Sequence, residues 1–312
     1  MALKDLLRVA DLGLADLRHL LDLSDELRSE PYRYHDLLRG DTVITYFAKP
    51  STRTRLSFGS AIARLGGTPE VVGPTELQLG RGETIEDTAR VVSRYARAFV
   101  IRTFADDEVC RFADAASIPV VNALTDLHHP CQALADLLTL RNHFGQLDGL
   151  KLAYVGDGNN VAHSLLEACA LTGMDIAVAS PAGFEPDAAI REAAEKLAAA
   201  SGSEIVVTHD PFAAVRDADA VYTDVWLSMG DDEAERSHRI AALTPFRVTP
   251  ELLAAASGRC VFMHCLPAHR GEEVAAEVID GPHSVVLDQA ENRMHTAQAL
   301  LLALLRGELR GA

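Results

Sequence analysis

The chain has 312 residues, a hydrophobic fraction of 48% and a formal net charge of −16 at pH 7. This length predicts two domains of about 150 residues each, and the acidic charge argues against a nucleic-acid partner, since phosphate backbones require a basic face. No apolar run reaches the roughly 18 residues of a membrane span, the N-terminal residues lack the pattern of a signal peptide, and five cysteines without paired spacing indicate a reducing, cytoplasmic setting.

Short apolar strands alternate with helical patterns in the first half of the chain. Leucines at helical spacing over 14–27 predict an amphipathic helix. The strands that we expect next lie at 43–47, 70–73, 98–101 and 119–122. The helices between and after them are expected at 52–65, 84–95, 106–117 and 129–143. Such alternation indicates a parallel sheet that is covered on both faces.

The glycine-containing segment 145–149 is the best domain boundary, because the same pattern restarts after it. Further strands are expected at 152–155, 176–178, 205–207, 220–222, 261–263 and 285–287, with a helix from the loop 156–160 to about 171. The charged segment 229–240 lacks an apolar period and is interpreted as a mobile loop. Residues 293–310 predict a strong helix that packs back across the boundary.

The expected fold class is therefore α/β with two domains, each a mostly parallel sheet flanked by helices. We place a first domain at 1–145, a second at 146–290 and the returning C-terminal helix at 291–312. In open parallel sheets, ligands bind beyond the carboxyl ends of the strands. The polar motifs that follow expected strands are Ser51 to Arg55, Arg102, His129 to Gln132, Asn159-Asn160, Asp224 to Met229, and His264 to Pro267.

The first of these motifs predicts an anion site. Ser51 is expected at the N-cap of a helix, with Thr52 to Arg55 in its first turn. First-turn N–H groups lack intrahelical partners and carry the positive end of the helix dipole, so hydroxyls and guanidiniums beside them form a socket for a phosphate dianion. Arg102 is a candidate to join Arg53 and Arg55 there. The alternative is a capped surface helix with two solvated arginines.

His129 and Gln132 lie one helical turn apart and therefore share a face. A neutral histidine donates to a carbonyl oxygen, and a glutamine amide holds an adjacent NH2 group by its oxygen. Together they suit a planar carbamoyl or amide group. The alternative is a histidine that only caps this helix.

The loop after strand 152–155 resembles a dinucleotide-binding turn only weakly, because Val161 stands where the third glycine belongs. Asn160 is instead a candidate to hold an amino-acid carboxylate. Asp224 follows another strand and is a candidate for an α-ammonium group. Trp226, the single tryptophan of the chain, is expected to pack.

Cys265 leaves two further hypotheses open. A Cys–His pair would suit acyl transfer. A metal would recruit Cys131 and Cys265 with His129 and His264, but these residues lack the paired spacing of structural zinc sites, so we expect no metal. Arg293 opens the last helix and is a candidate to return to the anion site of the first domain.

Taken together, these motifs resemble the aspartate/ornithine carbamoyltransferase family, and within it the members that use ornithine. The matching runs are Ser51-Thr52-Arg53-Thr54-Arg55, His129-Pro130-x-Gln132 with Ala135-Asp136-Leu137-Leu138, Asp224-Val225-Trp226 with Ser228-Met229-Gly230, and His264-Cys265-Leu266-Pro267. They stand in family order over about residues 45–295. The first two are shared with aspartate-using members, whereas the last two favour ornithine.

The resemblance implies a role for each matching residue. Carbamoyl phosphate binding is implied for Ser51, Thr52, Arg53, Thr54, Gln78, Arg102, His129, Pro130, Cys131, Gln132, Cys265, Leu266 and Arg293. Gln78 lies in the loop that reaches a neighbouring subunit in this family. Ornithine binding is implied for Asn160, Asp224, Ser228 and Met229. The catalytic groups would be Arg102, His129, Asp224 and Cys265.

The implied reaction moves the carbamoyl group of carbamoyl phosphate to the δ-amino group of L-ornithine, giving L-citrulline and phosphate in arginine metabolism. The resemblance also implies a homotrimer or a multiple of trimers, no cofactor, and no nucleic-acid or membrane partner. Alternatives are another acceptor (N-acetylornithine, aspartate or putrescine), a non-catalytic binder of phosphorylated metabolites, and a nicotinamide dehydrogenase. An acceptor-binding Asp224 argues against putrescine, which has no α-ammonium, and the incomplete glycine pattern argues against the dehydrogenase.

Overall fold

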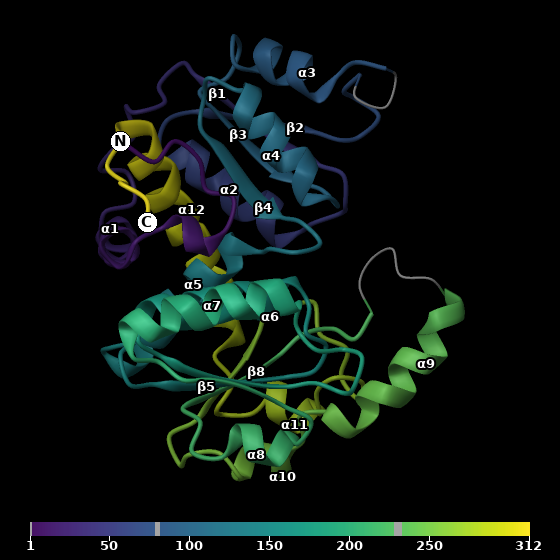
Figure 1. The fold of residues 1–312 in the computed structure, drawn as a ribbon. Helices are drawn as coiled ribbons and strands as arrows, with labels where there is room; N and C mark the ends of the chain where they lie inside the picture. Colours follow the sequence, from purple (N-terminus) through teal and green to yellow (C-terminus); the bar gives the residue numbers. More distant parts are fainter. Residues whose placement is uncertain (1, 79–81, 228–232) are drawn as a thin grey trace. The chain divides into compact units, whose positions relative to one another are not determined.

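The computed structural model describes residues 2–78, 82–227 and 233–312, and these form two compact units. Unit 1 comprises the chain up to Leu138 together with Glu291–Ala312, and unit 2 comprises Thr139–Ala290. Each unit is built on its own parallel sheet (Figure 1). None of the described helices combines the length and apolarity needed to cross a membrane.

The sheet of unit 1 has four parallel strands in the order β2-β1-β3-β4. The strands are β1 (Thr42–Phe47), β2 (Thr68–Val72), β3 (Ala98–Arg102) and β4 (Val120–Leu124). Strands β3 and β4 are nearly continuous apolar runs and almost wholly buried, as strands covered on both faces should be. The predicted α/β fold class is thereby confirmed for this unit.

Helices complete unit 1. They are α1 (Leu14–Ser29), α2 (Arg53–Arg64), α3 (Ile85–Val92), α4 (Asp106–Ala115), the first part of α5 (Pro130–Phe144) and the part of α12 (Val286–Arg306) from Glu291 on, with a short 3-10 helix η1 (Val9–Asp11). The C-terminal helix packs on this unit as predicted, because Asn292 accepts a hydrogen bond from Arg28 of α1 and Gln298 donates one to the Pro31 carbonyl at 2.8 Å.

The start of α2 differs from the prediction. The helix begins at Arg53, its N-cap is Thr52 and not Ser51, and no side chain caps it. Capping side chains reach back from an extended backbone, whereas Thr52 already has helical angles of φ −82° and ψ −57°. The first-turn N–H groups are therefore not covered by a capping hydroxyl.

The sheet of unit 2 has five parallel strands in the order β7-β6-β5-β8-β9. The strands are β5 (Lys151–Val155), β6 (Asp175–Ala179), β7 (Ile205–Thr208), β8 (Ala220–Thr223) and β9 (Val261–His264). The helices of unit 2, besides the end of α5 and the start of α12, are α6 (Asn160–Thr172), α7 (Ala188–Ser201), α8 (Pro211–Val215), α9 (Glu233–Leu243), α10 (Pro250–Ala254) and α11 (Ala276–Ile279), with a 3-10 helix η3 (Thr244–Phe246).

Two predictions in this unit are wrong. Residues 285–287 do not form a strand. Ser284 makes an isolated β-bridge with Phe262, and α12 begins at Val286, seven residues before the predicted start at Arg293. The second wrong prediction is the loop at 229–240. Of this segment the structure describes residues 233–240, and these belong to α9, which starts at Glu233. The large apolar residues of α9, Ile240 and Leu243, lie only in its last turn, so the segment 229–240 shows no apolar period.

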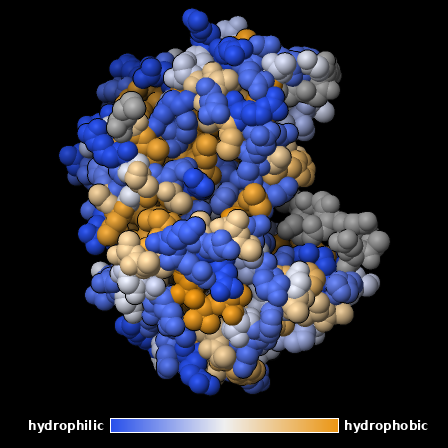
Figure 2. All heavy atoms as spheres, viewed as in Figure 1, coloured by the Kyte–Doolittle hydropathy of each residue, from blue (hydrophilic) through white to orange (hydrophobic). Residues whose placement is uncertain are grey.

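On the face drawn in Figure 2, hydrophilic residues predominate and hydrophobic residues appear in separate groups. Inside unit 1, a hydrophobic cluster centres on Phe99 of β3 and Phe112 of α4. Their rings stack with centroids 4.1 Å apart, and both side chains are buried. This aromatic pair fastens α4 to the sheet whose strand ends carry the polar motifs.

Replacing Phe99 with alanine should lower the free energy of unfolding by about 3–5 kcal/mol, because the variant loses a buried ring and leaves a cavity. Chemical denaturation measures this change. Tyr95→Ala is the control, since Tyr95 is 75% exposed and its loss should change stability by no more than about 0.5 kcal/mol. Equal effects of the two substitutions would contradict the described core.

Candidate active site

In both sheets the strand order reverses at one position, and this position locates the polar motifs. In unit 1 the chain leaves β1 toward β2 and later returns to the other side of β1 at β3; in unit 2 the reversal lies between β5 and β8. Ligands of open α/β sheets bind at the carboxyl ends of such strands. Arg53 and Arg102 stand at this position in unit 1, and Asn159 and Asp224 stand there in unit 2.

Unit 1 gathers cationic and polar groups at the start of α2. Arg53 is the first residue of that helix, and Thr54, the second, is buried. Arg293 of α12 is 3% exposed; its Nη2 donates to Thr54 Oγ1 at 3.0 Å and its Nη1 to Gln132 Oε1 at 2.5 Å. Gln132 in turn donates to Asp136 Oδ1 at 2.8 Å. Arg293 therefore joins the N-terminal turns of α2 and α5.

The Nε atom of Arg293 is buried and has no hydrogen-bond partner among the described residues. Its two other nitrogens meet uncharged side-chain oxygens, those of Thr54 and Gln132. A buried charge is costly unless it is paired. The guanidinium is therefore arranged to accept an anion at the positive end of α2.

His129 precedes α5 and is 4% exposed. Burial lowers the pKa of its imidazole well below 6.5, and the positive charges of Arg293, Arg102 and Arg53 lower it further. The structure thus brings His129 together with three arginines from three different elements, α2, β3 and α12. At pH 7 the ring is neutral and donates from one nitrogen only.

Three further residues with an implied role in carbamoyl phosphate binding are Cys131, Pro130 and Gln78, and the structure places each of them as follows. Cys131 is buried, its thiol donates to the Asn122 carbonyl at 3.4 Å, and burial raises the pKa of that thiol to about 12. A thiol that stays protonated is a poor metal ligand, which argues against the hypothesis of a metal bound through Cys131. Pro130 is the first residue of α5. Gln78 lies in the exposed segment after β2, where its carbonyl accepts a hydrogen bond from Glu83.

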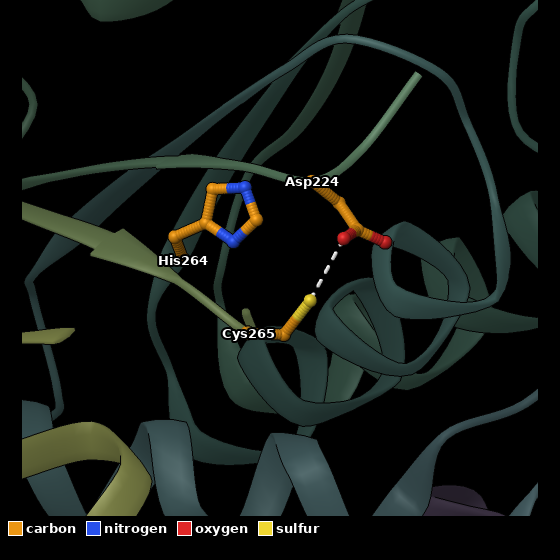
Figure 3. Close-up of side chains that lie close together, drawn as sticks. All are labelled: Asp224, His264 and Cys265. Carbon is orange, nitrogen blue, oxygen red and sulfur yellow. Dashed lines mark hydrogen bonds between the residues drawn. The ribbon is translucent and has the colours of Figure 1, made fainter. Parts of the chain in front are cut away.

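In unit 2, Asp224 follows β8 and is 6% exposed. Its carboxylate accepts three hydrogen bonds, each 2.8 Å long, from the Cys265 thiol, the Asn159 side-chain amide and the Val225 backbone N–H. Figure 3 shows the first of these bonds. Two separate strand-end loops therefore hold one carboxylate in a fixed orientation. The structure brings Asp224 and Cys265 together, as the hypothesis of a shared acceptor site requires.

His264 and Cys265 do not form the Cys–His pair that acyl transfer would need. Figure 3 shows the thiol directed at Asp224. The Nδ1 atom of His264 accepts from the Leu266 N–H at 2.8 Å, and its Nε2 lies 3.3 Å from Glu273. Both ring nitrogens thus serve to hold the turn, in which Leu266 adopts a left-handed φ of +58°. We conclude that His264 has a structural role.

Asn159 stands among the predicted strand-end motifs, but the sequence pattern assigned a ligand role only to its neighbour Asn160. It is the N-cap of α6, where its Oδ1 accepts from the N–H groups of Val161 and Ala162, and it also donates to Asp224. Asn160, which the analysis singled out, is the first residue of the helix. An asparagine directly before a helical segment is a recognised capping signal, and that signal identifies Asn159.

Tyr154 supports the same arrangement from within the sheet. Its hydroxyl donates to the Asp157 carbonyl at 2.8 Å and lies 3.2 Å from Asn159 Oδ1. Burial raises the pKa of this phenol well above 10, and Asp224 raises it further, so the phenol remains a donor. Ser228 and Met229, the other two implied ornithine ligands, lie outside the described residues.

The glycines of the loop after β5 have a packing explanation. A Cβ atom at Gly158 would overlap the backbone of Glu185 and Pro186. Gly156 has a φ of +142° and faces the side chain of Thr223. Close backbone packing accounts for Gly158 and the positive φ accounts for Gly156, so these glycines provide no independent support for a dinucleotide site.

Two family profiles match the chain. The profile "Aspartate/ornithine carbamoyltransferase, carbamoyl-P binding domain" matches residues 4–142. The profile "Aspartate/ornithine carbamoyltransferase, Asp/Orn binding domain" matches residues 148–304.

Curated relatives and solved structures are similar over nearly the whole chain. An ornithine carbamoyltransferase of Parafrankia sp. (strain EAN1pec) is 53% identical over 98% of this chain and 97% of the relative. That of Bacillus subtilis (strain 168) is 50% identical over 98% of this chain and 95% of the relative. The structure of ornithine carbamoyltransferase from Pyrococcus furiosus aligns with a TM-score of 0.93 at 48% identity, covering 99% of each chain.

The imidazole of His129 should remain neutral well below pH 6.5. The unfolded chain takes up a proton there near pH 6.5 whereas the folded chain does not, so this residue makes folding less favourable as the pH falls below that value. Imidazole NMR measures the titration directly, and a His129→Asn variant identifies the signal. A midpoint at or above pH 6.5 would contradict the described burial beside three arginines.

Proposed function

The chain belongs to the aspartate/ornithine carbamoyltransferase family, and from this premise we propose that it transfers the carbamoyl group of carbamoyl phosphate to the δ-amino group of L-ornithine. The products are L-citrulline and phosphate. The observation that supports this function most strongly is the group of Arg53, Arg102 and Arg293 around the neutral His129 in unit 1. In a chain with a net charge of −16, such a local cation cluster attracts an anion.

Unit 1 is proposed to bind carbamoyl phosphate. The phosphate dianion would take the first-turn N–H groups of α2, the hydroxyls of Ser51, Thr52 and Thr54, and the guanidiniums of Arg53 and Arg102. The carbamoyl end would face His129, Gln132 and Arg293. Arg293 supports this assignment because its buried Nε has no described hydrogen-bond partner.

His129 and Arg102 are proposed to stabilise charge in the transition state. Attack on the carbamoyl carbon places negative charge on its oxygen, and fixed donors aimed at that oxygen lower the barrier. A neutral imidazole donates without bringing a proton to the amine, which must itself stay unprotonated. The lowered pKa of His129 supports this division of roles.

Unit 2 is proposed to bind the amino-acid acceptor through Asp224, Cys265 and Asn160. An alkylamine has a pKa of about 10.4, so keeping it neutral at pH 7 costs roughly 4–5 kcal/mol. Desolvation and a nearby proton acceptor reduce that cost. Asp224 is held by three donors, which fits a carboxylate that must keep one orientation while it binds a cationic substrate.

We further propose that the protein acts in the cytoplasm in arginine biosynthesis, as a homotrimer or a multiple of trimers, and without a cofactor. The family supports these proposals, and the reaction needs no redox group, because the carbamoyl carbon of the mixed anhydride is itself the electrophile and phosphate is its leaving group. Light scattering after size-exclusion chromatography tests the assembly, with a mass of three times 33.6 kDa or a multiple of it as the expected result.

Citrulline formation tests the function. The purified protein should form citrulline and phosphate with ornithine, and much less product with N-acetylornithine, aspartate or putrescine. Turnover of another acceptor alone would contradict the proposal for unit 2 and leave that for unit 1 intact. No turnover with any acceptor would contradict the proposed activity itself.

Arg102→Met and His129→Asn should each lower kcat by about 100- to 1,000-fold, because each removes a donor to the developing oxyanion. Arg90→Met is the matched control, since the Arg90 side chain is 65% exposed on α3 and pairs with Asp87; its turnover should equal that of the wild type. A kcat within about threefold of wild type for both site variants would rule out this role.

A further inference from the structure

Arg239 of α9 contacts segments that follow three different strands of unit 2. Its Nε donates to the Trp226 carbonyl at 3.1 Å, after β8. Its Nη2 forms an ion pair with Asp157, after β5. Its guanidinium lies 5.1 Å from the centre of the Phe184 ring, after β6. One side chain thus ties together the loops at the carboxyl edge of the sheet.

The Arg239–Asp157 pair is shielded from water. The two side chains are 19% and 18% exposed. Arg236 of the same helix also pairs with a carboxylate, that of Glu272, but those two side chains are 43% and 36% exposed. An ion pair that is largely removed from solvent is screened less by salt. Removing one partner also leaves the other charge poorly compensated.

The contacts of Arg239 with Trp226 and with Asp157 each connect it to the surroundings of Asp224. Trp226 lies two residues after Asp224 on the same strand-end segment. On the other side, the Asp157 carbonyl accepts from the Tyr154 hydroxyl, that hydroxyl contacts Asn159, and Asn159 donates to Asp224. The position of the Asp224 carboxylate therefore depends on two loops that Arg239 holds against one another.

We propose that Arg239 is a positioning residue for the amino-acid acceptor site. It fixes the segments that carry Asn159 and Asp224, so its loss weakens binding of the acceptor while leaving binding of the carbamoyl donor nearly unchanged. The inference rests on the proposed function, since the acceptor is taken to be ornithine. It assigns a functional reason to α9, which carries this arginine.

Arginine is required here for its shape as well as its charge. Its planar fork donates from two nitrogens at once and stacks on an aromatic ring, whereas lysine offers one compact charge. Arg239→Lys should therefore recover part of the lost function through the charge, and Arg239→Met should recover none.

Steady-state kinetics with each substrate varied in turn test the proposal. Arg239→Met should raise KM for ornithine at least about tenfold, with KM for carbamoyl phosphate within about twofold of wild type, and Arg239→Lys should fall between. Arg236→Met, one turn earlier on α9, is the matched control and should behave as wild type. Asp157→Asn should raise KM for ornithine as well, and the double variant should show no additive increase.

An unchanged KM for ornithine in Arg239→Met would overturn the inference. Equal rises in both KM values would also overturn it, because they would indicate a general structural loss, and thermal unfolding of each variant records such a loss independently. Absence of citrulline with the wild type would overturn the proposed function and this inference with it. Wild-type activity with an unchanged Arg239→Met variant would overturn the inference alone.

Discussion

The burial of one cationic side chain, that of Arg293, against neutral partners is the constraint on which unit 1 depends. Arg293 is 3% exposed and meets Thr54 and Gln132, and together with Arg53 and Arg102 it lowers the pKa of the buried His129. Removing charges from water is costly unless an opposite charge compensates them. The protein therefore spends stability to hold a site whose charge balance improves when an anion binds at the N-terminus of α2.

Unit 2 holds a buried negative charge, where unit 1 holds a buried positive one, and it does so with hydrogen-bond donors. Its central group is a carboxylate, Asp224, which the donors of Cys265, Asn159 and Val225 surround. Asn159 has two functions, since it caps α6 and also orients Asp224. In both units, then, a helix N-terminus beside a reversal of strand order sets the position of a charged group, positive in one unit and negative in the other.

Sequence patterns predicted the two parallel sheets and most of the strand-end motifs, because buried apolar strands and the residues that follow them leave a local signal. They failed where the determining contact is not local. The charge network of Arg239 joins segments more than 50 residues apart in the sequence, and the large apolar residues of α9, Ile240 and Leu243, lie only in its last turn. The strand expected at 285–287 failed because three apolar residues are equally compatible with the first turn of a helix.

Calorimetry of inorganic phosphate binding tests the central claim, that Arg53 at the start of α2 forms an anion site with Arg102 and the buried Arg293. The wild type should bind one phosphate per chain. Arg53→Met should bind at least about tenfold more weakly, because a charge-assisted hydrogen bond is lost. Arg55→Met, whose arginine lies exposed in the same helical turn, should bind as the wild type does. No binding by the wild type, or equal losses in the two variants, would contradict the account.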